Sequence, residues 1–472
     1  MRWLLSSSLR RASPLSSSPG SLRMLSADPA TTPSFGDGRA FRLKRTSEIV
    51  RALTVFRMCS VPALVTHCDK LFSFARFLLR PHLFSLLMRA TAYGQFVAGE
   101  TVQEICVAMD KLSTMGMRPM LAVPIEEDLG ENREGEQQYD ENLAAMLDCV
   151  QLSKRGAKTT SPMMQLKVTA LLSAELCKRI TVLLSHPGLS EQFSLTRLLR
   201  AMEGQEVRFS GLSDGEAGHF LCGLRRLYHV GEYAKGHGVR VLVDAEYTYI
   251  NPALTLVTMA MMKKFNQSEP WIWNTYQCYL KDSFSLLSAD ISVSVRERFC
   301  FGMKLVRGAY MDKERKLANE QNYPDPIHQS WESTNHSYHQ SLDMILDLIA
   351  KDSKRYSIII ASHNEDSIKY AMKRMQELGI PKDGTGVCFG QLLGMCDHVS
   401  LTLGKPVSRR SAQSMKREIE AMENDIEESI PRGGGRENRT VLLGIRRERE
   451  LLQKELWRRV LRRASGPTGG TV

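Results

Sequence analysis

Short apolar runs alternate along the chain with stretches whose apolar residues recur at helical spacing. One such stretch, 338–350, places Leu342, Ile345 and Ile349 on a single helix face. Strands that alternate with helices predict parallel βαβ units with right-handed crossovers. The seven expected strands are 119–125, 164–171, 239–245, 273–280, 302–309, 357–362 and 386–392. Two further helices are expected between them, at 215–235 and 364–379.

Seven strands of this kind fit either a doubly wound sheet or a barrel that is one strand short. No GxGxxG motif follows an early strand and no GxxxxGK[ST] motif occurs, so the sequence does not indicate the usual dinucleotide or P-loop sites. We therefore favour an α/β fold of the distorted (β/α)8, TIM-like class with an N-terminal helical arm, in which the eighth strand is replaced by other sequence.

The two ends of the chain differ from its centre. Residues 1–27 hold four arginines, nine serines and no acid, a composition typical of a mitochondrial transit peptide, although a disordered tail would also fit. Near the other end, Ile445, Leu452, Leu456 and Val460 recur at helical spacing between arginines. This basic amphipathic helix could lie on an anionic membrane or pack on the protein body.

The expected organisation follows from these changes of pattern. It consists of a transit peptide and linker at 1–39, a helical arm at 40–115, a barrel at 116–404, a polar segment at 405–436 and a basic C-terminal helix at 437–472. No stretch reaches the roughly 20 uninterrupted apolar residues that a membrane-spanning helix needs.

Composition narrows the class of function. The 472 residues carry a net charge of +11, and the excess lies at the two ends. No zinc finger, RNP motif or basic–aromatic stripe is present, so we expect no nucleic-acid partner. The ten cysteines are scattered without a CxxC pair, and we predict free thiols and no metal site.

Polar residues stand where the expected strands end. In barrels of this class the chemistry lies at the carboxyl ends of the strands. The residues at these ends are Lys167, Asp244, Glu246, Gln277, Lys304, Arg307, His363, Asn364 and Gln391. The cations and acids could neutralise one another, or they could surround an anionic ligand. Each residue alone has an ordinary structural role available to it, but together they indicate a site. Gly302 and Gly308 permit the close approach of a flat cofactor to the backbone.

Strings around these strand ends resemble the proline dehydrogenase family, and most closely its vertebrate mitochondrial branch that oxidises hydroxyproline. The strings are 40–44, 93–101, 166–171, 243–248, 273–277, 304–310, 361–365 and 389–399. The resemblance covers about residues 40–404 and resumes at Glu437. The string 389–399 is the most specific of them.

The resemblance implies a flavoenzyme. It implies noncovalent FAD at the strand ends, oxidation of trans-4-hydroxy-L-proline to 1-pyrroline-3-hydroxy-5-carboxylate, and transfer of the electrons to quinone. Proline is the alternative substrate. The implied location is the matrix side of the mitochondrial inner membrane, whose surface is a further expected partner.

The resemblance also assigns roles to individual residues. Lys167 matches the lysine that pairs with the substrate carboxylate, and Asp244 the aspartate beside flavin and substrate. Gln277 matches the glutamine at the isoalloxazine edge, and Lys304 the cation near flavin N5. The remaining matches to cofactor-binding positions are Arg307, Gly308, Ala309, Ser362, His363 and Gln391.

One segment departs from the family pattern. After Gly404 the family continues with an eighth strand and a helix that carries a pair of arginines, which grip the substrate carboxylate. Residues 405–436 contain no apolar strand run, and we expect a polar helix followed by a glycine-rich linker. Without an eighth strand the barrel would keep two unpaired edges. An inactive FAD-binding or folding-defective isoform that lacks the carboxylate clamp is therefore an alternative to an active enzyme.

Overall fold

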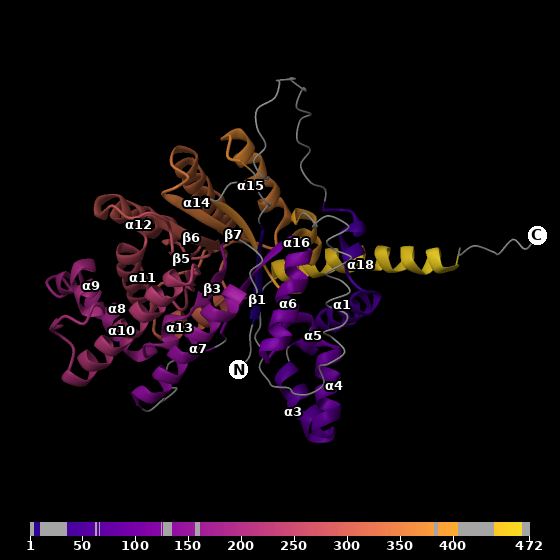
Figure 1. Ribbon diagram of the computed structural model, residues 1–472, viewed down its shortest axis with the longest axis horizontal. Coiled ribbons are helices and arrows are strands. Elements are labelled where there is room, and N and C mark those ends of the chain that lie inside the picture. Colours follow the sequence, from indigo (N-terminus) through magenta and orange to yellow (C-terminus); the bar gives the residue numbers. More distant parts are fainter. Residues whose placement is uncertain are drawn as a thin grey trace, which may run out of the picture.

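The central element of the protein is a barrel of β-strands surrounded by helices (Figure 1). The computed structural model describes residues 4–9, 35–61, 64–65, 67–123, 125, 135–155, 161–381, 386–404 and 439–464. Among these residues, seven strands run parallel in chain order: β2 (Met117–Ala122), β3 (Met163–Leu166), β4 (Arg240–Val243), β5 (Ile272–Gln277), β6 (Phe301–Val306), β7 (Tyr356–Ala361) and β8 (Val387–Leu392). All seven expected strands are confirmed.

The main error in the strand boundaries concerns the second expected strand. The apolar run 164–171 was expected to be one strand, but β3 ends at Leu166 and Val168–Ala170 forms a 3-10 turn, η2. The side chains of this turn are all buried. Val168 and Ala170 belong to the hydrophobic core, so the apolar run continues past the end of the strand.

An additional strand closes the barrel. β1 (Leu4–Leu9) lies antiparallel between β2 and β8, with Leu9 opposite Met117 and Ser8 opposite Gly390. It occupies the position that the missing eighth strand leaves, so the barrel formed by the described residues has no open edge. The sequence pattern does not predict this strand, because a serine-rich segment between arginines is typical of a leader. The segment 405–436 lies outside the described residues.

Helices form the outer layer of the barrel. They are α7 (Glu136–Arg155), α8 (Ala174–Leu184), η3 (Ser190–Phe193), α9 (Leu195–Met202), α10 (Asp214–Gly236), α11 (Asn251–Phe265), α12 (Ser283–Glu297), α13 (Met311–Glu320), α14 (Trp331–Lys351), α15 (Glu365–Glu377) and α16 (Asp397–Leu403). The three expected helices correspond to α10, α14 and α15. Ser213, Ser330 and Asn364 cap their N-termini by accepting backbone N–H bonds.

The interior of the barrel is filled by side chains. Most strands contribute one residue to this inner cluster: Met120, Met163, Leu242, Trp273, Ile359 and Cys388. On β6 the corresponding space is left by Gly302, where a Cβ would lie 2.7 Å from the Trp273 indole. Gly302 thus accommodates a core tryptophan, and the expectation that it makes room for a cofactor is wrong.

The N-terminal arm is helical, as expected. It comprises η1 (Gly38–Leu43), α1 (Thr46–Cys59), α3 (Cys68–Leu78), α4 (Pro81–Ala90), α5 (Ala92–Phe96) and α6 (Val102–Thr114). The C-terminal helix α18 (Arg439–Ala464) packs on α1 and η1. Ile445 and Leu452 are buried there, whereas Val460 is 48% exposed. This favours the packed alternative for the first half of α18. No helix among the described residues is long and apolar enough to cross a membrane.

Candidate active site

The strand ends bring most of the predicted site residues to one end of the barrel. Lys167 follows β3 directly, and Asp244 follows β4. The Asp244 N–H donates to the Leu166 carbonyl oxygen at 2.9 Å, so the two residues leave adjacent strands at the same level. Both side chains are half-buried. This is the arrangement that parallel strands of a barrel impose on residues just past their ends.

An ion pair joins two of these strand ends. Lys304 Nζ on β6 donates to the Asp244 carboxylate, reaching across the intervening strand β5. The two side chains are only 11% and 16% exposed. Of the two arrangements left open by the sequence, mutual neutralisation therefore describes this pair. The Lys304 ammonium group is therefore held at the strand ends by the Asp244 carboxylate, which is largely shielded from solvent.

A second network links the ends of β3, β4 and β5. Glu246 is fully buried, and its carboxylate accepts the Thr169 hydroxyl at 2.7 Å. Gln277 Nε2 donates to the Glu246 carbonyl oxygen at 3.1 Å. The buried Gln277 Oε1, in contrast, has no hydrogen-bond partner among the described residues. A buried amide oxygen without a donor is costly unless a ligand supplies one.

Arg307 is fixed by residues from α14 and α15 and by Ser362, which follows β7. Its guanidinium donates to Asn335 Oδ1, to Ser362 Oγ at 2.9 Å and to Ser367 Oγ at 2.7 Å. It also lies 4.4 Å from the centroid of the Tyr338 ring. Burial lowers the pKa of Arg307, since its hydrogen-bond partners here are neutral. Asn335 and Ser367 lie within helices, where inspection of strand ends could not find them.

His363 and Gln391 occupy the last two strand ends. Burial lowers the pKa of His363 to about 4, so the ring is neutral, and its Nε2 accepts the Leu392 N–H at 3.1 Å. The proton of the neutral ring then resides on Nδ1. Gln391 donates to the Ser362 carbonyl oxygen at 3.2 Å and accepts the Ser400 hydroxyl at 3.0 Å. The Gln391 amide therefore links Ser362, which follows β7, to Ser400 of α16.

An aromatic wall beside the site was missed by the sequence analysis. The Tyr247 ring lies 4.3 Å from that of Tyr310 and 5.3 Å from that of Tyr249, measured between centroids. Lys313 Nζ lies 4.1 Å from the Tyr247 centroid. The three tyrosines come from the loops after β4 and β6, and Lys313 belongs to α13. The sequence signal was weak, because isolated tyrosines in loops have no periodicity.

The fit of these residues to a flavin rests on Gln277. Its orphaned Oε1 requires an N–H donor, which the edge of an isoalloxazine ring provides. Gly308, which we expect to offer its backbone to a cofactor, has a φ of +142° and also packs on protein, since a Cβ there would lie 2.0 Å from the Tyr279 ring. Gln277 and the Lys304–Asp244 pair therefore carry the cofactor argument, and Gly308 does not.

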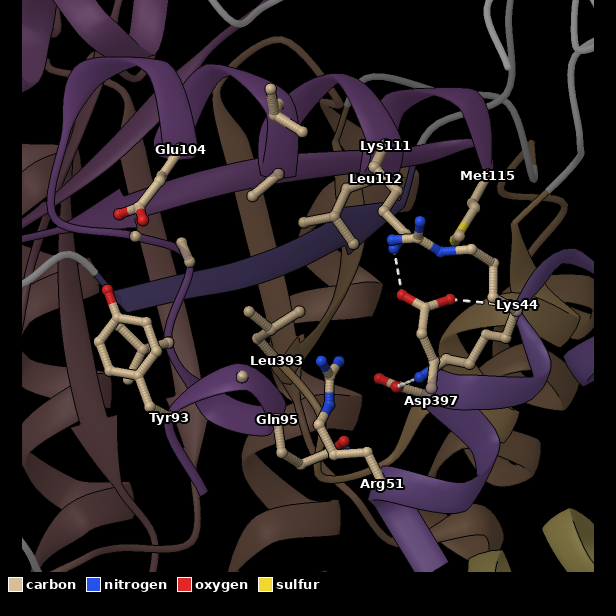
Figure 2. A pocket seen from close by; sticks show the side chains of 18 of the residues that line it. Lys44, Arg51, Tyr93, Gln95, Glu104, Lys111, Leu112, Met115, Leu393 and Asp397 are labelled. Atoms are coloured by element: carbon tan, nitrogen blue, oxygen red, sulfur yellow. Dashed lines mark hydrogen bonds and ion pairs between the residues drawn. The ribbon is translucent and has the colours of Figure 1, made fainter. Parts of the chain in front are cut away.

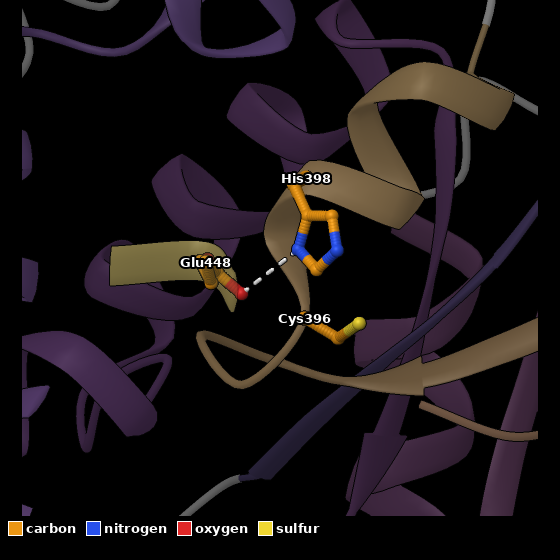
Figure 3. A group of neighbouring side chains, drawn as sticks. All are labelled: Cys396, His398 and Glu448. Carbon is orange, nitrogen blue, oxygen red and sulfur yellow. Dashed lines mark hydrogen bonds and ion pairs between the residues drawn. The ribbon is translucent and has the colours of Figure 1, made fainter. Parts of the chain in front are cut away.

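A cluster of possible metal ligands lies outside this site. Ligand atoms of Cys396, His398 and Glu448 lie within 4.8 Å of one another, and all three residues are buried (Figure 3). His398 Nδ1 faces Glu448 at 3.3 Å and Nε2 faces Glu365 at 3.0 Å. Burial alone would lower the pKa of His398, but these two carboxylates outweigh it and raise the pKa to about 9. The cluster is accordingly an ion-pair bridge between α15, α16 and α18.

Comparisons with known proteins agree with this geometry. The family model for proline dehydrogenase matches residues 108–415. Hydroxyproline dehydrogenase from Xenopus laevis is 55% identical over 90% of this chain and 90% of that protein. The chain belongs to the proline dehydrogenase family. Human hydroxyproline dehydrogenase is 46% identical over 90% of this chain and 93% of its own length. Human proline dehydrogenase 1, mitochondrial, is 30% identical over 95% of each chain.

A solved structure shares the fold of this family member. Proline utilization A from Bdellovibrio bacteriovorus aligns with a TM-score of 0.50 and 18% identity. The alignment covers 81% of this chain and 37% of that larger chain. At this level of identity the likeness shows the fold alone.

Proposed function

We propose that this chain is an FAD-dependent dehydrogenase that oxidises trans-4-hydroxy-L-proline to 1-pyrroline-3-hydroxy-5-carboxylate and passes the electrons to quinone. The observation that carries the proposal is the 55% identity to Xenopus laevis hydroxyproline dehydrogenase over 90% of both chains. The unsatisfied Gln277 Oε1 beside the Lys304–Asp244 pair supports a flavin at the strand ends.

When bound, FAD supplies a two-electron acceptor for the hydride that leaves the ring carbon next to the substrate nitrogen, while the nitrogen lone pair forms the new C=N bond. Lys304 would offset the negative charge that develops on the reduced cofactor, without transferring a proton. Lys167 pairs with the substrate carboxylate and fixes the orientation of the ring. Asp244 holds the Lys304 ammonium group in place.

The remaining predicted residues hold the cofactor. Gln277 contributes its unsatisfied amide oxygen, and Arg307 the cation fixed by Asn335, Ser362 and Ser367. Gly308 and Ala309 provide backbone contacts. Ser362 and the neutral His363 contact the adenine-nucleotide tail, and Gln391 positions Ser362. These assignments rest on the resemblance and on the strand-end placement.

Proline is the competing substrate. Family members that act on proline are 30% identical to this chain, against 55% for the Xenopus protein. Turnover of each imino acid with an artificial electron acceptor separates the two possibilities. We expect faster turnover of hydroxyproline, and faster turnover of proline would overturn this choice.

A catalytically silent isoform is the second candidate. The observation in its favour is that residues 405–436 contain no match to the paired arginines of the family's carboxylate clamp. A bidentate clamp is worth about 1.5–3 kcal/mol for each charge-assisted hydrogen bond. A purified protein that is yellow but is bleached by neither imino acid would support this candidate.

We further propose that the protein associates with the matrix side of the mitochondrial inner membrane through α3 and α4. These helices project from the barrel at one tip of the molecule (Figure 1). Their outward side chains are strongly apolar, since Phe74 is 63%, Phe77 89% and Leu86 66% exposed. Arg76 and Arg80 lie among them. An apolar face with neighbouring cations suits an anionic lipid surface.

Vesicle flotation tests this surface. We expect the full chain to float with vesicles that contain anionic lipid and to bind neutral vesicles weakly. F74S/F77S should abolish flotation, whereas the control L286S/V295S on α12 should retain it, because those exposed apolar residues lie on the barrel. Equal flotation of both variants would contradict this assignment.

A further inference from the structure

A cavity lies between the helical arm and the barrel. It has a volume of about 340 Å³ and is lined by residues of α1, α5, α6 and α16, among others (Figure 2). None of the predicted strand-end site residues is among its described lining residues. Its size falls at the lower end of the range for small-molecule sites, about 300–1,000 Å³. The cavity is therefore separate from the proposed flavin site.

Ion pairs neutralise several of the charges that line this cavity. Lys44 donates to Asp397, Lys111 donates to Glu48, and Arg89 donates to Glu104 at 2.7 Å. Burial acts to raise the pKa of Glu48, but Lys111 outweighs it and holds the pKa at about 2. Glu48 is consequently ionised and committed to Lys111.

Arg51 differs from these cations. Its Nε is buried and has no hydrogen-bond partner in the described part of the chain. Burial lowers the pKa of its guanidinium, and the more distant Glu48 and Asp397 offset this only in part. A buried Nε–H group without an acceptor is unfavourable, and an anion bound to the Arg51 guanidinium would remove this cost.

The surroundings of Arg51 leave space for a ligand. Its guanidinium points into the cavity beside Gln95, and Leu112 and Leu393 lie on the facing side (Figure 2). Gly94 lets the Arg51 guanidinium pack closely on α5, since a Cβ at this position would lie 2.9 Å from Arg51 Nη1. The cavity thus combines a planar cation whose Nε is unsatisfied with a partly apolar lining.

We propose that this cavity binds an organic monocarboxylate with an apolar body. The cavity lining holds five cations and three carboxylates, so it favours an anion, and the planar fork of Arg51 matches a carboxylate. The apolar walls favour a hydrocarbon body over a fully polar anion such as phosphate. This ligand site is additional to the proposed dehydrogenase activity and does not depend on it.

The ligand would strengthen the contact between arm and barrel. Arg51 and Gln95 belong to the arm, whereas Leu393 and Asp397 follow β8. The arm already contacts this loop, since Gln95 Nε2 donates to the Gly394 carbonyl oxygen at 2.8 Å. A carboxylate on Arg51 with its body on Leu393 would add a second link.

Calorimetric titration of the full chain with octanoate, and separately with inorganic phosphate, tests the proposal. We expect one octanoate per chain and weaker binding of phosphate. R51Q should weaken octanoate binding at least tenfold, and R51K, which keeps the charge but loses the fork, should weaken it less. The matched control R57Q, at an exposed position of the same helix, should bind as the unaltered protein does.

Two further readouts separate a ligand-binding role of Arg51 from a purely structural one. If Arg51 were only structural, R51Q would lower the unfolding temperature without ligand, whereas we expect no decrease because the substitution removes a buried N–H group that has no acceptor. Octanoate should also leave the flavin absorbance spectrum unchanged, since the cavity is separate from the strand ends. Absence of octanoate binding, equal binding by R51Q, or tighter binding of phosphate would each overturn the proposal.

Discussion

The barrel has two unequal sides at its carboxyl edge. From β3 to β7 each strand leads into a loop whose polar residue contacts a neighbouring loop or strand end, as in the Thr169–Glu246, Lys304–Asp244 and Arg307–Ser362 pairs. At the seam between β8 and β2, the antiparallel β1 begins where its neighbours end, with Leu4 opposite Ala122. β1 pairs with the edges of both neighbouring strands. Because it runs antiparallel to them, however, the chain leaves β1 at the opposite end of the barrel from the predicted site residues.

The difference teaches that closing a barrel and completing its site are separate requirements. Backbone pairing needs only an extended segment of suitable length, and β1 meets this need. A (β/α)8 site needs side chains on loops that follow parallel strands. The side from β3 to β7, where we propose that the flavin binds and which we call the flavin side, retains such loops, whereas β1 supplies none there.

The largest effect is expected from replacing Lys304, the cation of the Lys304–Asp244 pair on the flavin side. Lys304→Met leaves the Asp244 carboxylate without its partner and removes the charge that offsets reduced flavin. We expect the rate of anaerobic flavin reduction by hydroxyproline to fall by about 10²–10³-fold. Lys316→Met, at an exposed position of α13, is the control. An unchanged rate in Lys304→Met would show that the ion pair is only structural.

The ion-pair bridge that joins α18 to α15 and α16 depends on pH. His398 has a folded-state pKa of about 9 against an ordinary 6.5, so its contribution is complete below pH 6.5 and is lost as pH rises to about 9. We expect this contribution to be roughly 1–3 kcal/mol. Urea unfolding of the unaltered chain and of His398→Gln, at pH 6.5 and pH 9, measures it. A stability difference that does not shrink at pH 9 would refute the ion-pair bridge.

Removing residues 1–27 would distinguish the two sides of the barrel by their local stability. β2 and β8 would lose the strand that pairs both edges, whereas β4 to β6 would keep their neighbours. We expect amide hydrogen exchange to become about tenfold faster in β2 and β8 and to stay unchanged in β4 to β6. Equal exchange across all strands would mean that β1 does not stabilise the seam.

The smallest expected effect concerns the binding of the cofactor. Arg307→Lys keeps the charge but cannot reach Asn335, Ser362 and Ser367 together. We expect the dissociation constant for FAD to rise about fivefold. Arg315→Lys, at a half-exposed position, provides the comparison. A loss of affinity of the same size in both variants would remove the specific role of Arg307.

Periodicity made most of the fold predictable. The seven parallel strands and the helices between them follow from local patterns of apolar residues, and the parallel topology places Lys167, Asp244, Gln277 and Lys304 at one edge. β1 could not be found in this way, since a serine-rich segment carries no strand signal and its partners are distant in the sequence. Gly302 shows another limit of the sequence. A glycine indicates that space is left beside the backbone, but it does not show that the Trp273 side chain fills this space.

Parts of the site also depend on tertiary contacts. Asn335 and Ser367 hold Arg307 from within helices, and the aromatic wall of Tyr247, Tyr249 and Tyr310 joins two separate loops. No spacing in the sequence connects these residues. The resemblance to proline dehydrogenases identified the strand-end strings, whereas the supporting contacts required the structure.

An anaerobic absorbance titration of the purified chain with trans-4-hydroxy-L-proline tests the central claim most directly, because it reports flavin content and competence together. A functional flavin side predicts a yellow protein whose visible flavin absorbance is bleached by the imino acid. A yellow protein that remains unbleached, or a colourless one, would contradict the account.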